Sequence, residues 1–478
     1  MRLSSGQRYI SNYSSIVMVY FISMIIPFLI LMMIGRFYPV AEFGRYAIAT
    51  SFMGTVAILF NLGISNTVSF EIAVIDRRSK AQIAEILNVG SVCFAIFSLF
   101  GLLIVAVALY LLGYRPEIMK IIFALAPGYW LMGLNTIWNA TFLGIREMKY
   151  IVVSSLAVLM AVLLFVIPLV ILRKPLWVVA LVWSLSQIAG TAVILFLIGK
   201  KGYLKRSKIL KSKLSFFMRR ALGIGMDNLL FRLGDNLTNI LLPLYLTEEI
   251  IGIFNGAFKP FVLLVAGTQI SIQFFNPYIA AVRDSDKKSK EKILSAFHKL
   301  IFFFTFTVTV LPLFFAGAIN HLIFGSQLSR SVPYMVILTV GYLFANSPPY
   351  SSPLKALGLE WKVILSAAAK LILNIVGVVV LVPLLGLKGA IYAVVMSLIG
   401  YWLVNVVIYT YQKIKPISGV PNYILFLLFV LLNGWLLNSV WGEGLPVMLV
   451  FLLLNGVGGF FLYLRKADKT HLRELIKG

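Results

Sequence analysis

Charged residues are scarce in this sequence of 478 residues: Asp, Glu, Lys and Arg together make up 12%, whereas apolar residues make up 60%. Soluble domains carry about twice that share of charge, which excludes an ordinary soluble protein. The single cysteine, Cys93, excludes an intramolecular disulfide. His298 and His321 are too isolated for a metal site, and no P-loop pattern is present. We therefore expect no metal, no cofactor and no nucleotide hydrolysis.

Long apolar runs take the place of a charged surface. A helix needs roughly 20 apolar residues to cross about 30 Å of hydrocarbon, and fourteen runs approach that length. They are continuously apolar, which favours helices over the alternating strands of a membrane barrel. We expect an all-α polytopic membrane protein with about 14 transmembrane helices, the first of them retained and not a signal peptide, because no small-residue cleavage site follows it. The predicted spans are Ile16–Ile34, Tyr46–Phe70, Leu87–Leu112, Met119–Leu143, Tyr150–Leu172, Leu176–Ile198, Ala221–Leu244, Ile250–Val282, Phe297–Phe324, Pro333–Ser352, Val363–Leu385, Gly389–Tyr411, Tyr423–Val440 and Leu445–Leu464.

Basic residues are distributed unevenly between the two sides that these spans define. The side with both termini carries 31 Lys and Arg, and the opposite side carries 8. The positive-inside rule then places both termini in the cytoplasm and the chain in the cell (inner) membrane. The densest loop, from Lys200 to Arg220, has the charge of a nucleic-acid patch. We interpret it instead as a topological anchor that touches anionic lipid headgroups, and we expect no nucleic acid as a partner.

The chain repeats itself at an offset of about 210 residues. The matching segments are Ala41–Ala47 with Glu249–Asn255, Asp76–Lys80 with Asp284–Lys288, Leu143–Lys149 with Leu357–Lys362, and Pro168 with Pro383. Because six is even, both copies enter the membrane from the same side, which makes a parallel repeat. We expect two six-helix lobes, suited to alternating access around a central cavity, and two additional helices. The predicted domains are residues 1–200 for the N-terminal lobe, 201–217 for a basic cytoplasmic linker, 218–412 for the C-terminal lobe, and 413–478 for the last two helices and a short tail.

Polar side chains lie deep in three of the predicted spans, where they are costly and usually face a cavity or a partner. At 100° per residue they form one stripe on each helix. The stripes comprise Asp227, Asn228, Arg232, Asp235 and Asn239 in the seventh span, Asn255, Lys259, Gln269, Gln273 and Asn276 in the eighth, and Ser366, Lys370, Asn374 and Gly377 in the eleventh.

The ionisable members of these stripes are three cations, Arg232, Lys259 and Lys370, and two acids, Asp227 and Asp235. The excess of cations favours a water-filled cavity in the C-terminal lobe that receives an anionic group. Arg suits bidentate contact with phosphate, and Lys suits a point-charge contact. The alternative is pairing within the protein, above all between Arg232 and Asp235, which lie three residues apart.

The polar residues of the N-terminal lobe are mostly neutral, and Asn135 and Asn139 lie one turn apart in the fourth span. They either bind sugar hydroxyls or tie helices together, and the sequence leaves both open. The tripeptide Asp284-Ser285-Asp286 resembles the metal-binding DxD of sugar-nucleotide transferases, but it lies in a short basic turn without a nucleotide-binding domain. The external loops are too short for a glycan polymerase. We therefore expect no catalytic residue and no enzyme.

The first two spans resemble a known family signature. Gly35-Arg36-Phe37-Tyr38-Pro39 followed by Glu42-Phe43-Gly44-Arg45-Tyr46 is similar to R-x-L-G-P-x-x-F/Y-G-x-Y, and Leu62-Gly63-Ile64 with Glu71-Ile72-Ala73 is similar to L-G-L followed by R-E-I-A. Both patterns belong to the polysaccharide and O-antigen flippases (Wzx-like) of the multidrug/oligosaccharidyl-lipid/polysaccharide exporter (MOP) superfamily. The chain thus resembles this family, whose six-plus-six-plus-two layout agrees with the predicted spans.

The resemblance implies a flippase that moves a polyprenyl-diphosphate-linked oligosaccharide from the cytoplasmic to the periplasmic leaflet for surface polysaccharide synthesis. In that interpretation Arg232, Lys259 and Lys370 contact the diphosphate, and Asp227 or Asp235 binds a proton or sodium ion. Asn228, Asn239, Gln269, Gln273, Asn374, Asn135 and Asn139 are then candidates for a polar cavity. The partners implied are membrane lipids, a polysaccharide polymerase and glycosyltransferases. Alternatives are a cation-coupled drug or metabolite antiporter, a peptidoglycan-precursor flippase and a membrane scaffold.

Overall fold

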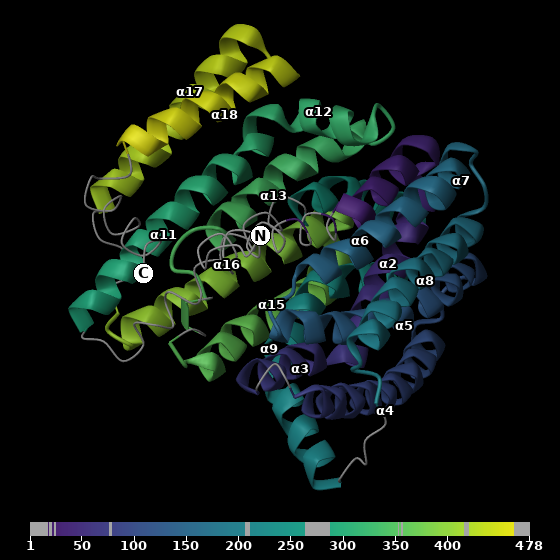
Figure 1. Cartoon of the computed structure of the whole chain (residues 1–478). Helices are drawn as coiled ribbons and strands as arrows, with labels where there is room; N and C mark the ends of the chain where they lie inside the picture. The colour runs from purple at the N-terminus through teal and green to yellow at the C-terminus, as the bar shows by residue number, and fades with distance from the viewer. Residues whose placement is uncertain are drawn as a thin grey trace, which may run out of the picture. The chain divides into compact units, whose positions relative to one another are not determined.

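The computed structural model describes residues 18, 22, 25–75, 79–205, 211–262, 287–351, 353–354, 357–414 and 420–462 (Figure 1). Every regular element within these ranges is a helix, as predicted. The chain divides into two compact units, Met1–Glu249 and Ile250–Gly478. The predicted site residues Gln269 and Gln273 lie outside the described ranges.

The first unit contains a helix at Ile25–Phe37 that precedes the labelled elements. Its other elements are α2 (Val40–Asn61), α3 (Ile64–Val74), α4 (Lys80–Leu112), α5 (Pro116–Gly144), α6 (Lys149–Ala161), η1 (Val162–Val166), α7 (Ile167–Ile171), α8 (Leu176–Lys201), α9 (Lys211–Leu241) and η2 (Leu242–Leu244).

A helix over residues 248–262 leads from the first unit into the second. The remaining elements are α11 (Lys287–Thr309), α12 (Leu311–Phe324), η3 (Ser329–Ser331), α13 (Val332–Ala345), α15 (Glu360–Leu385), α16 (Leu387–Tyr411), α17 (Val420–Trp441) and α18 (Leu445–Leu462). Consecutive helices α15 and α16 pack along each other, as do α17 and α18 (Figure 1).

Eight helices in the described ranges are long and apolar enough to cross a membrane, and one bent pair raises the number to nine. Shorter apolar helices, Ile25–Phe37 and Leu445–Gly456, lie in the first and the last predicted spans. The prediction of a multi-pass helical membrane protein is therefore confirmed. The total of about fourteen spans stays a prediction.

Proline and glycine set several helix ends in the first unit. Helix α2 follows Pro39 and α5 begins at Pro116, where the missing N–H of proline costs no helical hydrogen bond. Gly113 directly follows α4 and Gly202 directly follows α8, and their φ angles of 55° and 77° are left-handed, a conformation that glycine adopts easily. These prolines and glycines thus place the short polar turns between the helices.

The helix starts recur at the offset that the sequence repeat predicts. The pairs are Val40 with residue 248, Lys80 with Lys287, Lys149 with Glu360, and Leu176 with Leu387, at separations of 208, 207, 211 and 211 residues. Each pair begins a helix of the same rank in the two copies. The compact units, however, divide after Glu249, whereas the predicted C-terminal lobe begins at residue 218, so the division into lobes stays a prediction.

Helix α9 packs on α2 and α3 through glycines in a close backbone contact. The second predicted span is broken at Leu62 and Gly63, whose φ angles are 32° and 80°. A Cβ atom at Gly63 would lie 2.7 Å from the Gly225 nitrogen of α9, and a Cβ atom at Gly225 would lie 2.6 Å from the Leu62 carbonyl oxygen. Two backbones can approach this closely only where both lack side chains. These glycines hold α9 in the first unit.

In the second unit the ninth and tenth predicted spans are not straight. Helices α11 and α12 are bent by 49° near Val310, and Pro312 lies in the first turn of α12. Helix α13 ends at Ala345, earlier than the predicted span end at Ser352, and residues 346–351 are non-helical. Proline lacks the N–H that a continuing helix needs, which explains the early end before Pro348 and Pro349.

The contact at Gly225 predicts that Gly225→Ala lowers stability by about 1–3 kcal/mol, since the added methyl group overlaps the Leu62 carbonyl. Gly223→Ala is the matched control on the same helix, because a Cβ atom there meets no atom within 4 Å. Helix propensity alone would make this control neutral or stabilising by about 0.5–1 kcal/mol. Thermal unfolding of the purified protein, followed by labelling of the buried thiol of Cys93, measures both. Equal stability of the two variants would contradict the close backbone contact.

Candidate functional site

The cation and acids predicted in the seventh span lie on α9. Arg232 is exposed, Asp235 is half-buried and Asn239 is fully buried. The side chains of Asp227 and Asn228 lie outside the described part of the structure. Along this stripe the side chains thus become more buried from Arg232 to Asn239. The assignment of Arg232 and Asp235 to a transport site stays a prediction.

The cations predicted in the eighth and eleventh spans differ in burial. Lys259 is half-buried in the helix 248–262, whereas Lys370 on α15 is only 2% exposed. One turn later on α15, Asn374 is 1% exposed, and one turn earlier Ser366 is fully buried. The structure therefore places the whole eleventh-span stripe inside the second unit. Whether Arg232, Lys259 and Lys370 meet at one site stays a prediction.

Asn135 and Asn139 join helices in the first unit. The Asn139 side-chain amide donates to Asn135 Oδ1 at 2.7 Å, and the hydroxyl of Ser154 on α6 donates to the carbonyl oxygen of Gly190 on α8 at 3.0 Å. That hydroxyl also lies 3.4 Å from Asn135 Oδ1. Of the two interpretations left open by the sequence, these contacts favour the one in which the amides tie α5, α6 and α8 together.

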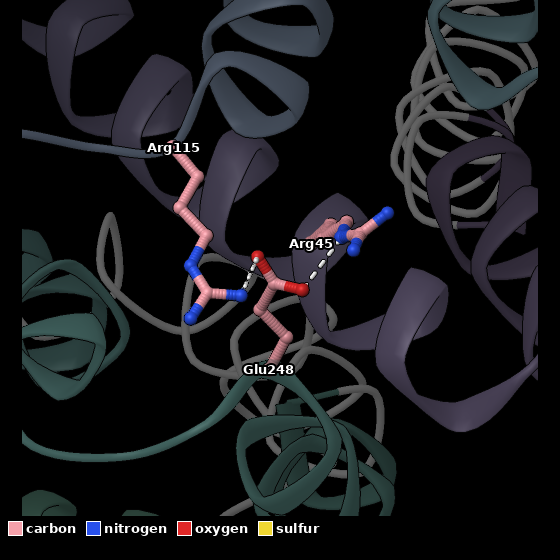
Figure 2. Close-up of polar contacts among 3 residues, drawn as sticks. All are labelled: Arg45, Arg115 and Glu248. Carbon is pink, nitrogen blue, oxygen red and sulfur yellow. Dashed lines mark hydrogen bonds and ion pairs between the residues drawn. The ribbon is translucent and has the colours of Figure 1, made fainter.

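A second cluster, which the sequence did not single out, centres on Glu248 (Figure 2). Its Oε2 accepts a hydrogen bond from Arg45 Nε at 2.7 Å, and its Oε1 lies 3.8 Å from Arg115 Nη1. Glu248 is only 7% exposed, so its charge is largely removed from water. A buried carboxylate is stable only with cationic or hydrogen-bonding partners, and here two guanidinium groups supply them. We call this cluster the Glu248 bridge.

The starts of three helices bring the members of the Glu248 bridge together. Arg45 lies on the second turn of α2, Arg115 directly precedes Pro116 at the start of α5, and Glu248 begins the helix 248–262. Beside Arg115, the buried hydroxyl of Tyr114 donates to the carbonyl oxygen of Ile240 on α9 at 2.7 Å. Burial raises the pKa of Tyr114 above its ordinary value, which keeps this hydroxyl a donor. The bridge therefore joins the starts of α2, α5 and the helix 248–262, and the Tyr114 hydrogen bond holds the end of α9 beside them.

The opposite ends of these helices carry further ion pairs. Glu71 of α3 pairs with Arg220, Glu85 of α4 with Lys213 at 2.5 Å, and Glu147 of the α5–α6 turn with Lys201 at 2.8 Å. Arg220 and Lys213 belong to α9, so part of the basic loop predicted as a topological anchor also pairs with acids of its own unit. These pairs are partly exposed, and each contributes at most about 1 kcal/mol. Helix α9 is thus held by ion pairs in its N-terminal part and by the Tyr114 hydrogen bond near its C-terminal end.

The ring of Tyr150 lies beside the Glu147–Lys201 pair. The ammonium groups of Lys149 and Lys201 each lie 5.0 Å from the centre of its ring, within the range of cation–π attraction. Nearby, burial and the negative charge of Glu147 raise the pKa of Tyr203. Within the described ranges, no group of three or more His, Cys, Asp and Glu side chains is arranged to hold a metal ion.

Taken by itself, this geometry is that of a helical membrane protein whose helix ends are closed by ion pairs and whose interior holds a buried cation. The bridging contacts are non-covalent and lie at turns, so they can open and re-form when helices tilt. Such contacts suit a transporter that exposes one side at a time, and nothing in the described residues resembles a nucleophile with an adjacent base.

Comparison with known proteins agrees with this interpretation. A family model described as "Polysaccharide biosynthesis protein" matches residues 10–282, which is more than half of the chain. No curated protein sequence matches.

Solved structures with the same fold are transporters. The lipid II flippase MurJ in an inward closed conformation has a TM-score of 0.63 at 14% identity, over 93% of this chain and 97% of MurJ. An inward-facing multidrug resistance MATE family transporter of the MOP superfamily has a TM-score of 0.59 at 15% identity, over 81% and 93%. A MOP superfamily transporter from Pyrococcus furiosus has a TM-score of 0.53 at 18% identity, over 83% and 94%. At these identities the likeness shows that the chain shares the fold of these transporters.

The Glu248 bridge predicts that Glu248→Gln lowers stability by about 1–3 kcal/mol, because two guanidinium groups lose their shared counter-charge. Glu117→Gln is the matched control, since Glu117 is an exposed acid in the first turn of α5 near the same end. We expect this control to stay within about 0.5 kcal/mol of the wild type. In the Glu248→Gln background, Arg45→Met should lower the stability by less than it does in the wild-type protein. Thermal unfolding, followed by labelling of Cys93, measures the stability of the two single variants and the double variant. Additive effects of the two substitutions would contradict the coupling between Arg45 and Glu248.

Proposed function

Because the chain belongs to the polysaccharide biosynthesis protein family, we propose that it is a flippase that moves a polyprenyl-diphosphate-linked oligosaccharide from the cytoplasmic to the outer leaflet of the cell membrane. The transported lipid would serve the synthesis of a surface polysaccharide such as O-antigen, capsule or exopolysaccharide. Glycosyltransferases would assemble the oligosaccharide before this step, and a polysaccharide polymerase would act after it. Its termini lie in the cytoplasm in this proposal, as the basic loops indicate.

The buried cation Lys370 is the observation that carries the proposal. An ammonium group inside a membrane span is costly, and such groups usually mark the path of a substrate or ion. Its neighbours on α15 are the neutral hydrogen-bonding side chains of Ser366 and Asn374, also buried. A diphosphate needs cations and the attached sugars need neutral donors and acceptors, so this stripe combines the two chemistries that such a substrate requires.

The remaining predicted residues take roles around Lys370. Lys259 and Arg232 would add positive charge for the diphosphate, and Asp227 or Asp235 would bind a proton or sodium ion that resets the site. In the proposed orientation the Glu248 bridge lies at the outer side. It would close that side while the cytoplasmic side is open, and it would separate when the substrate is released outward.

A transport assay tests the proposal directly. We expect Lys370→Ala and Lys259→Ala to slow transbilayer movement of a fluorescent polyprenyl-diphosphate oligosaccharide in proteoliposomes by about tenfold or more, since charge-assisted contacts contribute about 1.5–3 kcal/mol. Lys388→Ala is the control, because Lys388 is an exposed cation in the first turn of α16. Normal movement in both Lys370→Ala and Lys259→Ala would refute the cationic site.

The charge of the substrate gives a second expectation. Moving one negative charge outward across an inside-negative membrane releases about 2.3 kcal/mol per 100 mV, so a doubly charged diphosphate gains about twice that. We therefore expect a potassium-diffusion potential, inside negative, to increase outward movement in the same proteoliposomes. A rate and an end point that do not respond to the potential would argue against outward movement of a net negative charge.

The structural likeness to MurJ supports a second candidate, a flippase for the lipid-linked peptidoglycan precursor. It uses the same cationic chemistry and differs in the sugars, so competition between the two lipids in the same assay separates the candidates. A cation-coupled antiporter is the third. It predicts efflux of a cationic dye and no movement of either lipid.

A further inference from the structure

The two copies of the repeat differ in the helix that precedes the turn to α6 or to α15. In the first copy, α5 runs through Asn135 to Gly144. In the second copy, Asn346 lies 211 residues after Asn135, which is also the separation of the starts of α6 and α15. Helix α13, however, has already ended at Ala345, and residues 346–351 are non-helical. Irregular backbone thus takes the place of a helix at this level of the second unit.

Helix α16 lies against this irregular backbone. The Tyr409 hydroxyl donates to the Tyr350 carbonyl oxygen at 3.0 Å, and the Tyr401 hydroxyl lies 2.5 Å from the Ser351 hydroxyl. Irregular backbone at the depth of a membrane span is tolerated only where it is buried in protein or lines a watery passage. The face of α16 that carries the two tyrosines is therefore the face on which the second unit departs from regular helix packing.

Asn405 lies between these two tyrosines. It is one turn from Tyr401 and one turn from Tyr409, within about 40° of each around the helix. It is 1% exposed, and within the described ranges neither its amide nitrogen nor its amide oxygen has a hydrogen-bond partner. A buried amide without a partner is costly, and a leucine would fill a similar space without that cost. The amide is therefore suited to a ligand that brings both a donor and an acceptor.

The register of α15 against α16 relates this amide to the buried cation of α15. Gly377 packs against Ala393, and Gly400 packs against Leu373, so the two helices run antiparallel. Continued towards the start of α15, the same register places Lys370 about one turn of α16 away from the partnerless amide.

Lys370 also lies on the matching face of its helix. It precedes Gly377 by seven residues, which places the two within about 20° of each other on the face that packs on α16. Lys370 is 2% exposed, and Ser366, one turn earlier, is fully buried. A helical turn rises about 5.4 Å, a length comparable with one sugar ring. A group held by Lys370 would therefore bring the next group of the same ligand to the level of Asn405.

The chemistry of an asparagine side chain indicates what that next group is. Its amide presents an acceptor oxygen and N–H donors side by side in one plane. Two vicinal hydroxyl groups of a sugar match this edge, because one can donate to Oδ1 while the other accepts from Nδ2. An ionised diphosphate offers acceptors alone and matches a cation instead. A diphosphate followed directly by a sugar thus fits Lys370 and Asn405 in that order.

We propose that Asn405 is a specificity-determining residue that binds two vicinal hydroxyl groups of the sugar next to the diphosphate, while Lys370 holds the diphosphate itself. The inference rests on the proposed function and adds which part of the sugar is recognised. Asn405 is closed off in the arrangement described, so the sugar reaches it when residues 346–351 and α16 separate during the transport cycle.

Transport of paired lipids by the full-length protein in proteoliposomes tests the inference. A panel of fluorescent polyprenyl-diphosphate lipids that carry glucose, galactose or N-acetylglucosamine is assayed first. The lipid that moves fastest is then compared with its analogue that lacks the 3-hydroxyl, because every vicinal pair of ring hydroxyls in a hexopyranose linked through C1 includes this group. We expect the wild type to move the complete lipid about tenfold or more faster than the 3-deoxy analogue, since the analogue leaves the buried amide incompletely paired.

Substitutions then assign the preference to its cause. Asn405→Leu removes the amide, so it should move both lipids at equal rates and should fold at least as well as the wild type, as followed by thermal unfolding with Cys93 labelling. Asn405→Ser, whose hydroxyl is too short to replace the amide, should lose the preference in the same way. Asn433→Leu is the matched control on α17, where the half-buried Asn433 amide donates to Asn455 Oδ1 at 3.4 Å, and it should keep the preference.

The outcomes separate this inference from the proposal on which it rests. If the wild type moves no lipid of the panel, the proposed function is overturned and the inference with it. Movement without a preference for the 3-hydroxyl, a preference that persists in Asn405→Leu and Asn405→Ser, or one lost in Asn433→Leu would overturn the role of Asn405 alone and would leave the flippase proposal intact.

Discussion

The need to satisfy every backbone N–H and C=O group without water governs the structure of this protein. It makes the described elements helical, and it limits where a helix can be interrupted. At Leu62 and Gly63 the interruption is covered by the backbone of α9, which approaches through Gly225. At residues 346–351 side chains of α11 and α16 supply the missing partners. Both interruptions are thus closed by contacts between helices distant in the sequence.

Charge follows the same constraint. Four acids of the first unit that form ion pairs, Glu71, Glu85, Glu147 and Glu248, lie at or near helix ends, where a partner can be reached and water remains nearby. Cations behave differently, since Lys370 is buried within α15. These four acids thus hold helix ends, whereas a cation, Lys370, is buried within a span. That division is what a carrier of an anionic lipid headgroup would require.

The polar residues of the interior serve two purposes, and their contacts distinguish them. Asn135 and Asn139 are engaged with each other and connect through Ser154 to α8, which makes them part of the packing. His298 is engaged with a segment that has no helical structure of its own, where it accepts a hydrogen bond from the Tyr350 N–H. A buried polar group can thus join two regular helices, or it can supply a hydrogen bond that irregular backbone lacks.

The sequence by itself determined the class of the protein, because hydrophobic length, charge asymmetry and repeat are properties of the chain and the bilayer alone. It located the spans at Leu176, Val363 and Gly389 close to their helices, and it identified Lys370 as an interior cation. It could not find the Glu248 bridge, since Arg45, Arg115 and Glu248 are far apart in the chain and each looks like an ordinary turn residue. It also could not find the break after Ala345 or the hydrogen bond between His298 and the Tyr350 N–H. Such contacts depend on which helix faces which, and only tertiary packing, through glycine contacts and hydrogen bonds between distant segments, decided that.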